Sequence, residues 1–365
     1  MLIDGHSLTI EQVVEVARGE QPAALAPEAR ERMAQSRKWV EEIAANSRAV
    51  YGINTGFGIF ADRRISAADT QQLQRNLILS HAAGVGEPFP AEVVRAAMLI
   101  RANTLALGLS GVRPEVVETL LAMLKAGVTP IVPAQGSLGS SGDLAPLSHL
   151  ALVLSTDAAT DGVEESGEAW AADKRMSGAE AMAAAGIPRL VLGPKEALAL
   201  NNGATFCAAL AALAVADSET LIAASEVALA LTLEALMGAS AAFDERLHAA
   251  RGQAGQQRVA AHVRRLTAGS TLVDAGGRVQ DAYSVRCAPQ VIGPARDTLE
   301  FVRGIVERES NAATDNPLLF EGQALSGGNF HGEILGLAMD YLGIAIAEVG
   351  AIAERRIARL VDEKL

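Results

Sequence analysis

The segment from Ser218 to Met237 most constrains the fold, because as a helix it is apolar on nearly every face. Such a helix needs neighbours on all sides, which places it in the centre of a bundle. Long apolar segments continue from Lys195 onward, and residues 333–365 read as one long helix with few charges. Hydrophobic residues form 50% of the chain but aromatic residues only 4%, so Ala, Leu, Val and Ile supply most of the apolar mass. That composition favours close-packed helices over a β-sandwich.

The first part of the chain is less regular. Thr9 and Gln12 have the spacing of a capping box, which predicts the start of a short helix. A polar, acidic excursion over residues 157–178 predicts a small surface hairpin around Trp170. Further helices are expected at residues 28–45, 68–79, 91–107 and 114–125. We therefore expect two parts, an N-terminal one at residues 1–194 and a central long-helix bundle at residues 195–365.

Charge and composition exclude several classes of partner. The net charge of −12 argues against nucleic acid, which is normally met by a basic stripe. Two cysteines, Cys207 and Cys287, make neither a disulfide framework nor a zinc quartet and suit a reducing cytoplasm. No signal peptide is evident, and Glu226 and Glu234 bracket the most apolar run, so no membrane partner is expected. His331 has no Cys, His or carboxylate partners at metal-ligand spacing, so no metal is expected.

A glycine- and serine-rich stretch runs from Gly136 to His149 and holds three glycines among four serines. The glycines allow backbone conformations closed to other residues, and Pro146 marks the opening of a helix. By composition alone, the stretch reads as a loop that caps this helix or as a nest that binds an anion. A nucleophile elbow is excluded, because Gly-x-Ser-x-Gly requires glycine where Asp143 stands.

One chemistry fits the tripeptide Ser140, Ser141 and Gly142 if it is held tightly at a helix start. The amide nitrogen of Gly142 can attack the carbonyl of Ser140 and close a five-membered ring. Loss of water and dehydration of Ser141 then leave an exocyclic methylidene conjugated to the ring. No ordinary side chain supplies such an electrophile, and the positive end of the helix would make it more electron-poor.

This stretch resembles the signature of the histidine ammonia-lyase and aromatic amino-acid lyase family, whose methylidene-imidazolone (MIO) group forms from Ala-Ser-Gly. Ser140 stands where alanine is commonest, but only its carbonyl enters the ring. The resemblance implies an MIO group formed autocatalytically from Ser140, Ser141 and Gly142, with no metal or nucleotide cofactor.

Two further motifs resemble signatures of the same family. Tyr51 opens a glycine-rich loop over residues 51–58, at the position of the family's catalytic base. Without the resemblance it would be a packed tyrosine in a surface loop. Asn202 lies in an otherwise apolar run, where the family has an asparagine that polarises the ring carbonyl. Without the resemblance, Asn202 would be a core amide that has its hydrogen-bond partners and bends a helix.

The segment of residues 279–290 is a further constellation. At helical spacing, Tyr283 and Arg286 share one face, with Gln280 one turn before them. The fork of an arginine can bind both oxygens of a carboxylate, although a structural salt bridge is the general alternative. The family uses the matching residues at its active site. The resemblance implies that Arg286 holds the substrate carboxylate, Tyr283 orients the substrate and Gln280 faces the imidazole.

Two other residues bear on the substrate. His81 ends an expected helix, where a lone histidine is usually structural. Tyrosine-specific relatives tend to have His-Leu, and phenylalanine-specific ones Phe-Leu, at the positions of Ser80 and His81, so this pair favours histidine. Phe330 matches a pocket residue of the family. By contrast, His262 is expected on the solvated face of a polar helix.

The resemblance covers nearly the whole chain and implies a mainly α, fumarase/aspartase-like architecture. It implies histidine degradation, with L-histidine converted to trans-urocanate and ammonia after the substrate amine adds to the MIO group. The small-molecule amino-acid substrate would be held in a cytoplasmic homotetramer, because relatives build the site from several subunits. Family members continue past Leu365, so we expect a chain without the family's C-terminal region.

Three alternatives stay open. The protein could be a lyase or aminomutase for another aromatic amino acid. It could be a catalytically silent, truncated assembly subunit. A metal-free helical lyase of the fumarase type is weaker, because the serine-loop signature of that type is not apparent.

Overall fold

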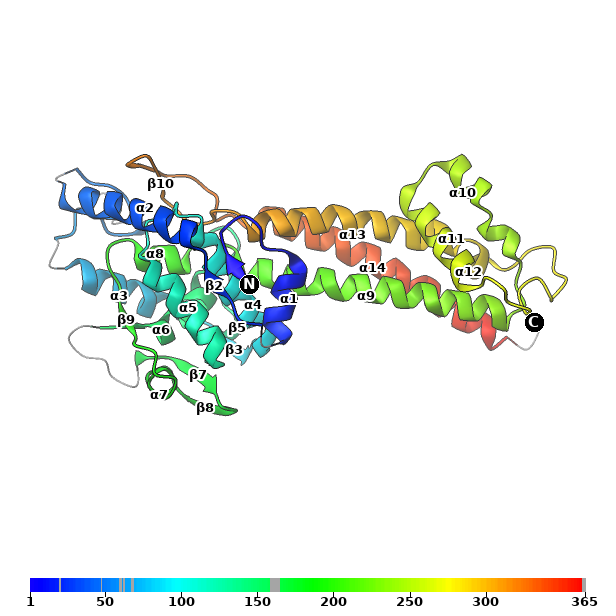
Figure 1. The fold of residues 1–365 in the computed structure, drawn as a ribbon, viewed down its shortest axis with the longest axis horizontal. Coiled ribbons are helices and arrows are strands. Elements are labelled where there is room, and N and C mark those ends of the chain that lie inside the picture. The colour runs from blue at the N-terminus through cyan, green and yellow to red at the C-terminus, as the bar shows by residue number, and fades with distance from the viewer. Residues whose placement is uncertain are drawn as a thin grey trace. The chain divides into compact units, whose positions relative to one another are not determined.

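The computed structural model describes residues 1–362 except 20, 47, 59, 60, 62, 67, 68 and 158–164. Long and short helices dominate the described chain, and the strands form small sheets of two or three members (Figure 1). The prediction of a mainly α fold is confirmed. The chain divides into two compact units, each described separately: Met1–Leu213 with Val306–Leu335, and Ala214–Ile305 with Gly336–Leu365.

The first unit packs short helices around α4, whose residues from Ala96 to Ala106 are all buried. The helices that lie wholly within this unit are α1 (Ile10–Arg18), α2 (Pro27–Ala45), α3 (Thr70–His81), α4 (Ala91–Ala106), α5 (Pro114–Ala126), α6 (Leu144–Leu154), α7 (Gly178–Ala184) and α8 (Glu196–Asn201). The predicted capping box forms at α1, where the Thr9 side chain accepts from the backbone of Gln12 and the Gln12 side chain accepts from Thr9.

The strands of the first unit form small sheets that connect its loops. β1 (Leu2–Ile3) and β2 (Ala24–Leu25) are parallel, as are β6 (Ser155–Thr156) and β9 (Leu190–Val191). β3 (Val85–Pro88) pairs with β5 (Pro133–Gln135), and β10 (Leu318–Phe320) with β11 (Gln323–Leu325), both antiparallel. β4 (Thr129–Pro130) and β8 (Lys174–Ser177) flank β7 (Glu168–Ala171). The β7–β8 pair, with the partly exposed Trp170, is the predicted hairpin.

The second unit is built on parts of α9 (Thr205–Ala235), α13 (Ala288–Ser310) and α14 (Glu333–Leu360). Glu219 and Glu226 of α9 pair with Arg303 and Arg296 of α13. Because one numbering rises as the other falls, α9 and α13 run antiparallel. Shorter helices α10 (Glu245–Arg251), α11 (Ala254–Leu266) and α12 (Tyr283–Arg286) complete the unit, together with the 3₁₀ turn at Ser240–Phe243.

Two sequence predictions are wrong in the second unit. His262 is not on a solvated face: its side chain is only 22% exposed and its Nδ1 contacts the carboxylate of Glu226, which is fully buried. Gln280 is not part of a helix, because α12 begins only at Tyr283 and the preceding backbone is irregular. The spacing of residues in the sequence could not predict the burial of His262 or the start of α12 at Tyr283, because both depend on how the chain folds around them.

The central position expected for residues 218–237 is also only partly realised in the single chain. Leu221, Val227 and Leu231 of α9 are exposed, as are Leu337 and Ile344 of α14. By length and composition alone, α9 and α14 could cross a membrane, but core helices of other bundles pass the same test. These side chains give both helices exposed apolar surface.

Candidate functional site

The turn at Ser140–Gly142 is compressed against a second turn of the chain. Gly142 has φ +80°, and a Cβ added there would lie 2.6 Å from the backbone nitrogen of Gly203. Gly203 itself has φ +133° and forms a bridge with Gly142. A side chain at either position would be strained and would clash, so only glycine fits this contact. The end of the tripeptide is thus packed tightly against the backbone of Gly203.

Asp143 fastens this turn to the starts of two helices. Its backbone N–H donates to the carbonyl of Gly203 at 2.9 Å, directly before α6 begins. Its buried carboxylate accepts the hydroxyl of Ser137 and the backbone N–H of Cys207 at 3.0 Å. Burial, followed by the charge of Asp143, raises the pKa of the Cys207 thiol to about 12. Cys207 therefore remains a neutral thiol and is a poor nucleophile.

A cavity of about 300 Å³ in the first unit opens beside the tripeptide. Its lining comes from segments distant in the sequence: Tyr51, Phe57, Gly58, Leu77, His81, Ser141, Leu144, Leu198, Asn201, Asn202, Asn316 and Phe330. The structure thus brings five of the sequence-derived site residues to one cavity, namely Tyr51, His81, Ser141, Asn202 and Phe330.

The polar groups of this cavity have defined partners. The side-chain amide of Asn202 donates to the carbonyl of Ser141 at 3.0 Å. Nδ1 of His81 lies 2.9 Å from the carbonyl of Leu77, which can only accept, so a neutral His81 carries its proton on Nδ1. Its Nε2 is then a hydrogen-bond acceptor. The Tyr51 ring packs edge-on against Phe57, with centroids 6.4 Å apart.

Gln280, Tyr283 and Arg286 belong to the second unit and are not among the residues that line this cavity. The guanidinium of Arg286 lies 4.5 Å from the centre of the Tyr283 ring, and its Nε donates to the carbonyl of Asp281 at 2.9 Å. The Tyr283 side chain is 71% exposed. The segment therefore presents an aromatic ring and a cation together at the surface of the single chain.

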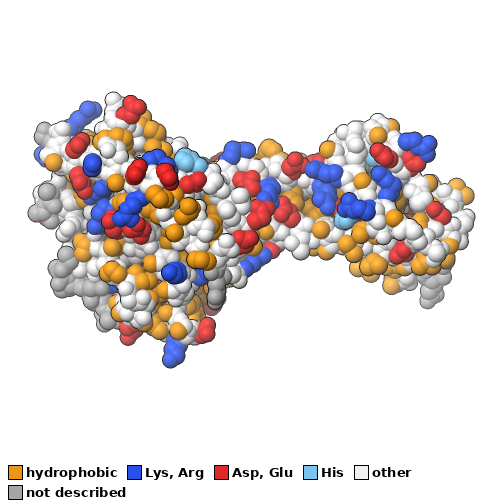
Figure 2. Space-filling model, in the orientation of Figure 1, with side chains coloured by type: hydrophobic (Ala, Val, Ile, Leu, Met, Phe, Trp, Pro, Cys, Tyr) orange, Lys and Arg blue, Asp and Glu red, His pale blue; other side chains and the backbone are white. Residues whose placement is uncertain are grey.

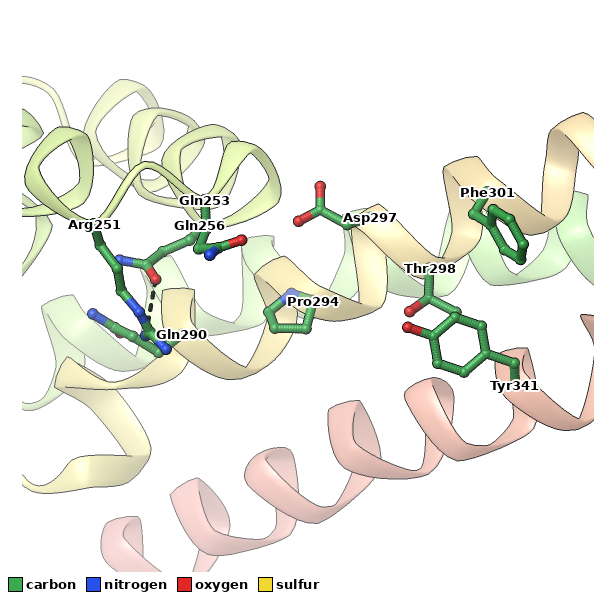
Figure 3. A pocket seen from close by; sticks show the side chains of 9 residues that line it. All are labelled: Arg251, Gln253, Gln256, Gln290, Pro294, Asp297, Thr298, Phe301 and Tyr341. Atoms are coloured by element: carbon green, nitrogen blue, oxygen red, sulfur yellow. Dashed lines mark hydrogen bonds between the residues drawn. The ribbon is translucent and has the colours of Figure 1, made fainter.

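Another cavity, of about 500 Å³, lies in the second unit and contains none of the predicted site residues (Figure 3). Of its polar side chains, Arg251 donates to Gln256 at 3.1 Å and Asp297 accepts from Arg258, outside the lining, at 3.1 Å, whereas Oε1 of Gln290 has no hydrogen-bond partner among the described residues. Tyr341 packs against Phe301 across the opening. This lining offers no paired nucleophile and base, so the chemistry points to the cavity beside the tripeptide.

Comparison with known proteins identifies the family of this chain. The sequence profile described as aromatic amino acid lyase matches residues 8–365. The chain belongs to the aromatic amino acid lyase family. Within this family, the histidine ammonia-lyase of Alkaliphilus metalliredigens is 51% identical over 367 residues, which cover 100% of this chain and 71% of the relative.

Solved structures agree with the assignment to the aromatic amino acid lyases. The histidine ammonia-lyase of Trypanosoma cruzi matches with a TM-score of 0.89 at 38% identity, covering 100% of this chain and 67% of that one. The tyrosine aminomutase of Streptomyces globisporus matches with a TM-score of 0.91 at 36% identity, covering 100% and 72%. The helical fold described above is therefore the fold of the family.

Sequence reasoning missed the buried charges behind the site of this lyase. Arg101 and Lys195 are fully buried, and Lys195 pairs with Asp315 at 2.5 Å. Glu196 is also buried; burial favours its neutral form, but the hydrogen bond and charge of Arg113 prevail and lower its pKa. A charged residue within an apolar run, such as Arg101 inside α4, could have indicated these buried charges. Such a residue is rarely buried unless it has a specific partner.

Proposed function

We propose that the protein is an ammonia-lyase that converts L-histidine to trans-urocanate and ammonia. The observation that carries the proposal is the compressed Ser140–Gly142 turn, packed on Gly203 beside the cavity that Tyr51 and His81 line. The curated histidine ammonia-lyase of Alkaliphilus metalliredigens supports the choice of reaction, since it matches along the whole chain.

The residues present fit an MIO group formed from the chain itself. Ring closure joins the nitrogen of Gly142 to the carbonyl carbon of Ser140, whose oxygen leaves as water. The hydroxyl of Ser141 leaves as a second water together with its α-hydrogen. The contact that a Cβ on Gly142 would fill and the amide of Asn202 on the Ser141 carbonyl both suit this ring. Once formed, the ring supplies the electrophile that makes the substrate's amino group a better leaving group.

The remaining work falls to side chains. The reaction breaks a C–H bond at the β-carbon and the C–N bond at the α-carbon, and a C=C bond forms between the two carbons. Tyr51 takes the β-proton on its phenol oxygen, as a general base in the cavity. Asn202 polarises the ring carbonyl through its donated hydrogen bond. The apolar walls supplied by Leu144 and Phe330 exclude water from the reacting atoms.

The two ends of the substrate are held by different groups. Nε2 of His81 accepts the imidazole N–H, which distinguishes histidine from the carbocyclic amino acids. Arg286 binds the substrate carboxylate with its fork, while Tyr283 orients the substrate and Gln280 adds a second polar contact to the imidazole. In our proposal these three residues reach the cavity of another copy of the chain.

That arrangement requires more than one copy of the chain, and we propose a homotetramer. The exposed Tyr283 and the fully exposed Val279 show that this segment has surface available for a partner. Leu221 and Leu231 of α9 and Ile344 of α14 are also exposed, and Figure 2 shows apolar atoms at the surface of the second unit among its charged groups. Packing between copies would remove these side chains from water. The two free cysteines suit the reducing cytoplasm in which we place the protein.

A second candidate function is a lyase or aminomutase acting on another aromatic amino acid. The similarity to the tyrosine aminomutase of Streptomyces globisporus favours it, since that protein shares the fold at 36% identity. The polar pair Ser80 and His81 beside the cavity favours histidine instead.

Intact-mass spectrometry tests the proposal directly. The purified protein should be lighter than its sequence by two waters, and it should release urocanate from histidine. Ser141→Ala should remove both the mass deficit and the activity, whereas Ser140→Ala should retain both, because only the carbonyl of residue 140 enters the ring. A full sequence mass for the unaltered protein would overturn the proposal. Tyrosine or phenylalanine turned over in preference to histidine would select the second candidate.

A further inference from the structure

Arg101 lies in the middle of α4 and is fully buried. One of its terminal nitrogens, Nη2, donates to the backbone carbonyl of Asn202. Burial lowers the pKa of Arg101 to about 10, while the charges of Asp315 and Asp143 oppose this shift. The guanidinium is therefore still a cation at neutral pH, in a place where a charge is costly to keep.

The surrounding carboxylates are already engaged by other groups. Asp315 accepts from Lys195 at 2.5 Å and from the hydroxyl of Ser110 at 2.6 Å. Asp143 accepts from Cys207. Among the residues that the structure describes, Nε and Nη1 of Arg101 have no hydrogen-bond partner. The contact with the Asn202 carbonyl is thus the one hydrogen bond that the Arg101 side chain makes among the described residues.

That carbonyl sits at a break in the chain. α8 ends at Asn201, Asn202 caps it, and α9 begins only at Thr205. Between them, Gly203 has a φ of +133° that only glycine adopts readily. A Cβ on Gly203 would lie 2.8 Å from Nη2 of Arg101, so the guanidinium touches the same peptide that faces Gly142. The bridge to Gly142 and the hydrogen bond from Asp143 hold Gly203, and the Arg101 contact holds the carbonyl end of the peptide between Asn202 and Gly203.

We propose that Arg101 is a positioning residue for ring formation, which holds the Asn202–Gly203 peptide as the surface against which Ser140–Gly142 closes. The same contact aims the Asn202 side chain at the Ser141 carbonyl. Arg101 is not among the residues that line the cavity, and among the described residues its side chain has no hydrogen bond to the tripeptide. Its effect passes through Asn202 and Gly203. The inference rests on the proposed function, because it concerns how the MIO group forms.

The test compares Arg101→Lys and Arg101→Met by intact mass after expression of the full chain. Arg101→Lys keeps a charge and a donor, whereas Arg101→Met keeps the bulk and loses both. We expect the fraction of chains lacking two waters to fall at least fivefold in Arg101→Met and less in Arg101→Lys. Thermal unfolding of each variant identifies folded protein, and only the folded fraction is counted.

Arg95→Lys is the matched control. Arg95 also lies on α4 and donates to backbone carbonyls, including Val16 at 2.8 Å and Gly19 at 2.9 Å, which are not among the residues that line the cavity beside the tripeptide. Its mass deficit should equal that of the unaltered protein. If folded Arg101→Met is dehydrated as completely as Arg95→Lys, Arg101 is merely structural and the inference is wrong. If the unaltered protein shows no mass deficit, the proposed function is wrong, and so is this inference.

Should Arg101→Met fail to fold, Arg101→Lys decides the matter through the same measurement. Ring content below that of Arg95→Lys supports the positioning role, and equal ring content overturns it. The KM for histidine gives a second readout. A defect in ring formation lowers the number of active sites, but it should leave the KM of the remaining active sites unchanged.

Discussion

The side chain of Asn202 donates a hydrogen bond to the backbone carbonyl of Ser141 across 3.0 Å. Their positions are distant in the sequence, yet this contact joins the end of α8 to the loop before α6. The bond fixes the peptide that follows Ser141, which is the peptide whose nitrogen must attack in ring closure.

Asn202→Ala should therefore lower kcat for histidine by about 10²–10³, the loss typical for removal of one positioned donor at a reaction centre. Asn201→Ala is the control, since Asn201 donates to Ser148 at 3.2 Å rather than to the tripeptide. It should cost stability while leaving the two-water mass deficit in place. Equal loss of the deficit in both variants would contradict a specific role for Asn202.

Tyr51→Phe should lower kcat by about 10²–10⁴ and change KM little, because it removes the proposed base and keeps the ring. The Phe57 ring that packs edge-on against Tyr51 should hold the new phenylalanine in the same place. Steady-state kinetics with histidine measure both constants. A variant that retains full turnover would assign the base to another residue.

His81→Leu should reduce kcat/KM for histidine by about 10- to 100-fold relative to phenylalanine. The substitution leaves the imidazole N–H of the substrate without its acceptor in the cavity. Parallel assays with histidine, tyrosine and phenylalanine measure the change. An unaltered preference would make His81 a structural residue that only caps the carbonyl of Leu77.

His149 should make the stability of the protein depend on pH. Its Nε2 accepts the N–H of Gly84 at 3.1 Å, and burial lowers its pKa. A neutral His149 is thus favoured by folding, so this stability is fully present above the ordinary histidine pKa of about 6.5. It is lost as the pH falls from there through the lower pKa of the folded state.

Thermal unfolding at several pH values measures this effect. His149→Gln, which does not titrate, should flatten the dependence below pH 6.5 and cost about 1 kcal/mol at neutral pH if its amide fits poorly. An unaltered pH dependence in His149→Gln would place the titrating group elsewhere.

Glu226→Gln should destabilise the second unit by about 2 kcal/mol or more. Glu226 is fully buried, and its carboxylate contacts both His262 and Arg296, so removing its charge leaves a cation without its partner. Glu219→Gln is a matched control on the same helix pair. Glu219 is 41% exposed and pairs with Arg303, and it should contribute less than about 1 kcal/mol. Equal losses of unfolding free energy would show that burial of Glu226 is unimportant.

Local patterns in the sequence determined the features that depend on near neighbours. The capping box of Thr9 and Gln12 forms as expected, because both partners lie within one helical turn. The hairpin around Trp170 and the helix that opens near Pro146 follow from turn and helix chemistry in the same way. The glycines at positions 142 and 203 were also visible in the sequence, although the contact between them was not.

Tertiary structure alone decided which polar groups are buried and what they meet. His262 reads as a solvated residue of a polar helix, yet α11 packs so that it contacts Glu226 of α9. Arg101 is enclosed within the first unit and donates to Asn202, a partner that the sequence does not indicate. Each of these contacts joins segments remote along the chain. The energy of each contact depends on the distance between the two groups and on the local dielectric constant. Both are set by the tertiary structure and not by the spacing of residues in the sequence.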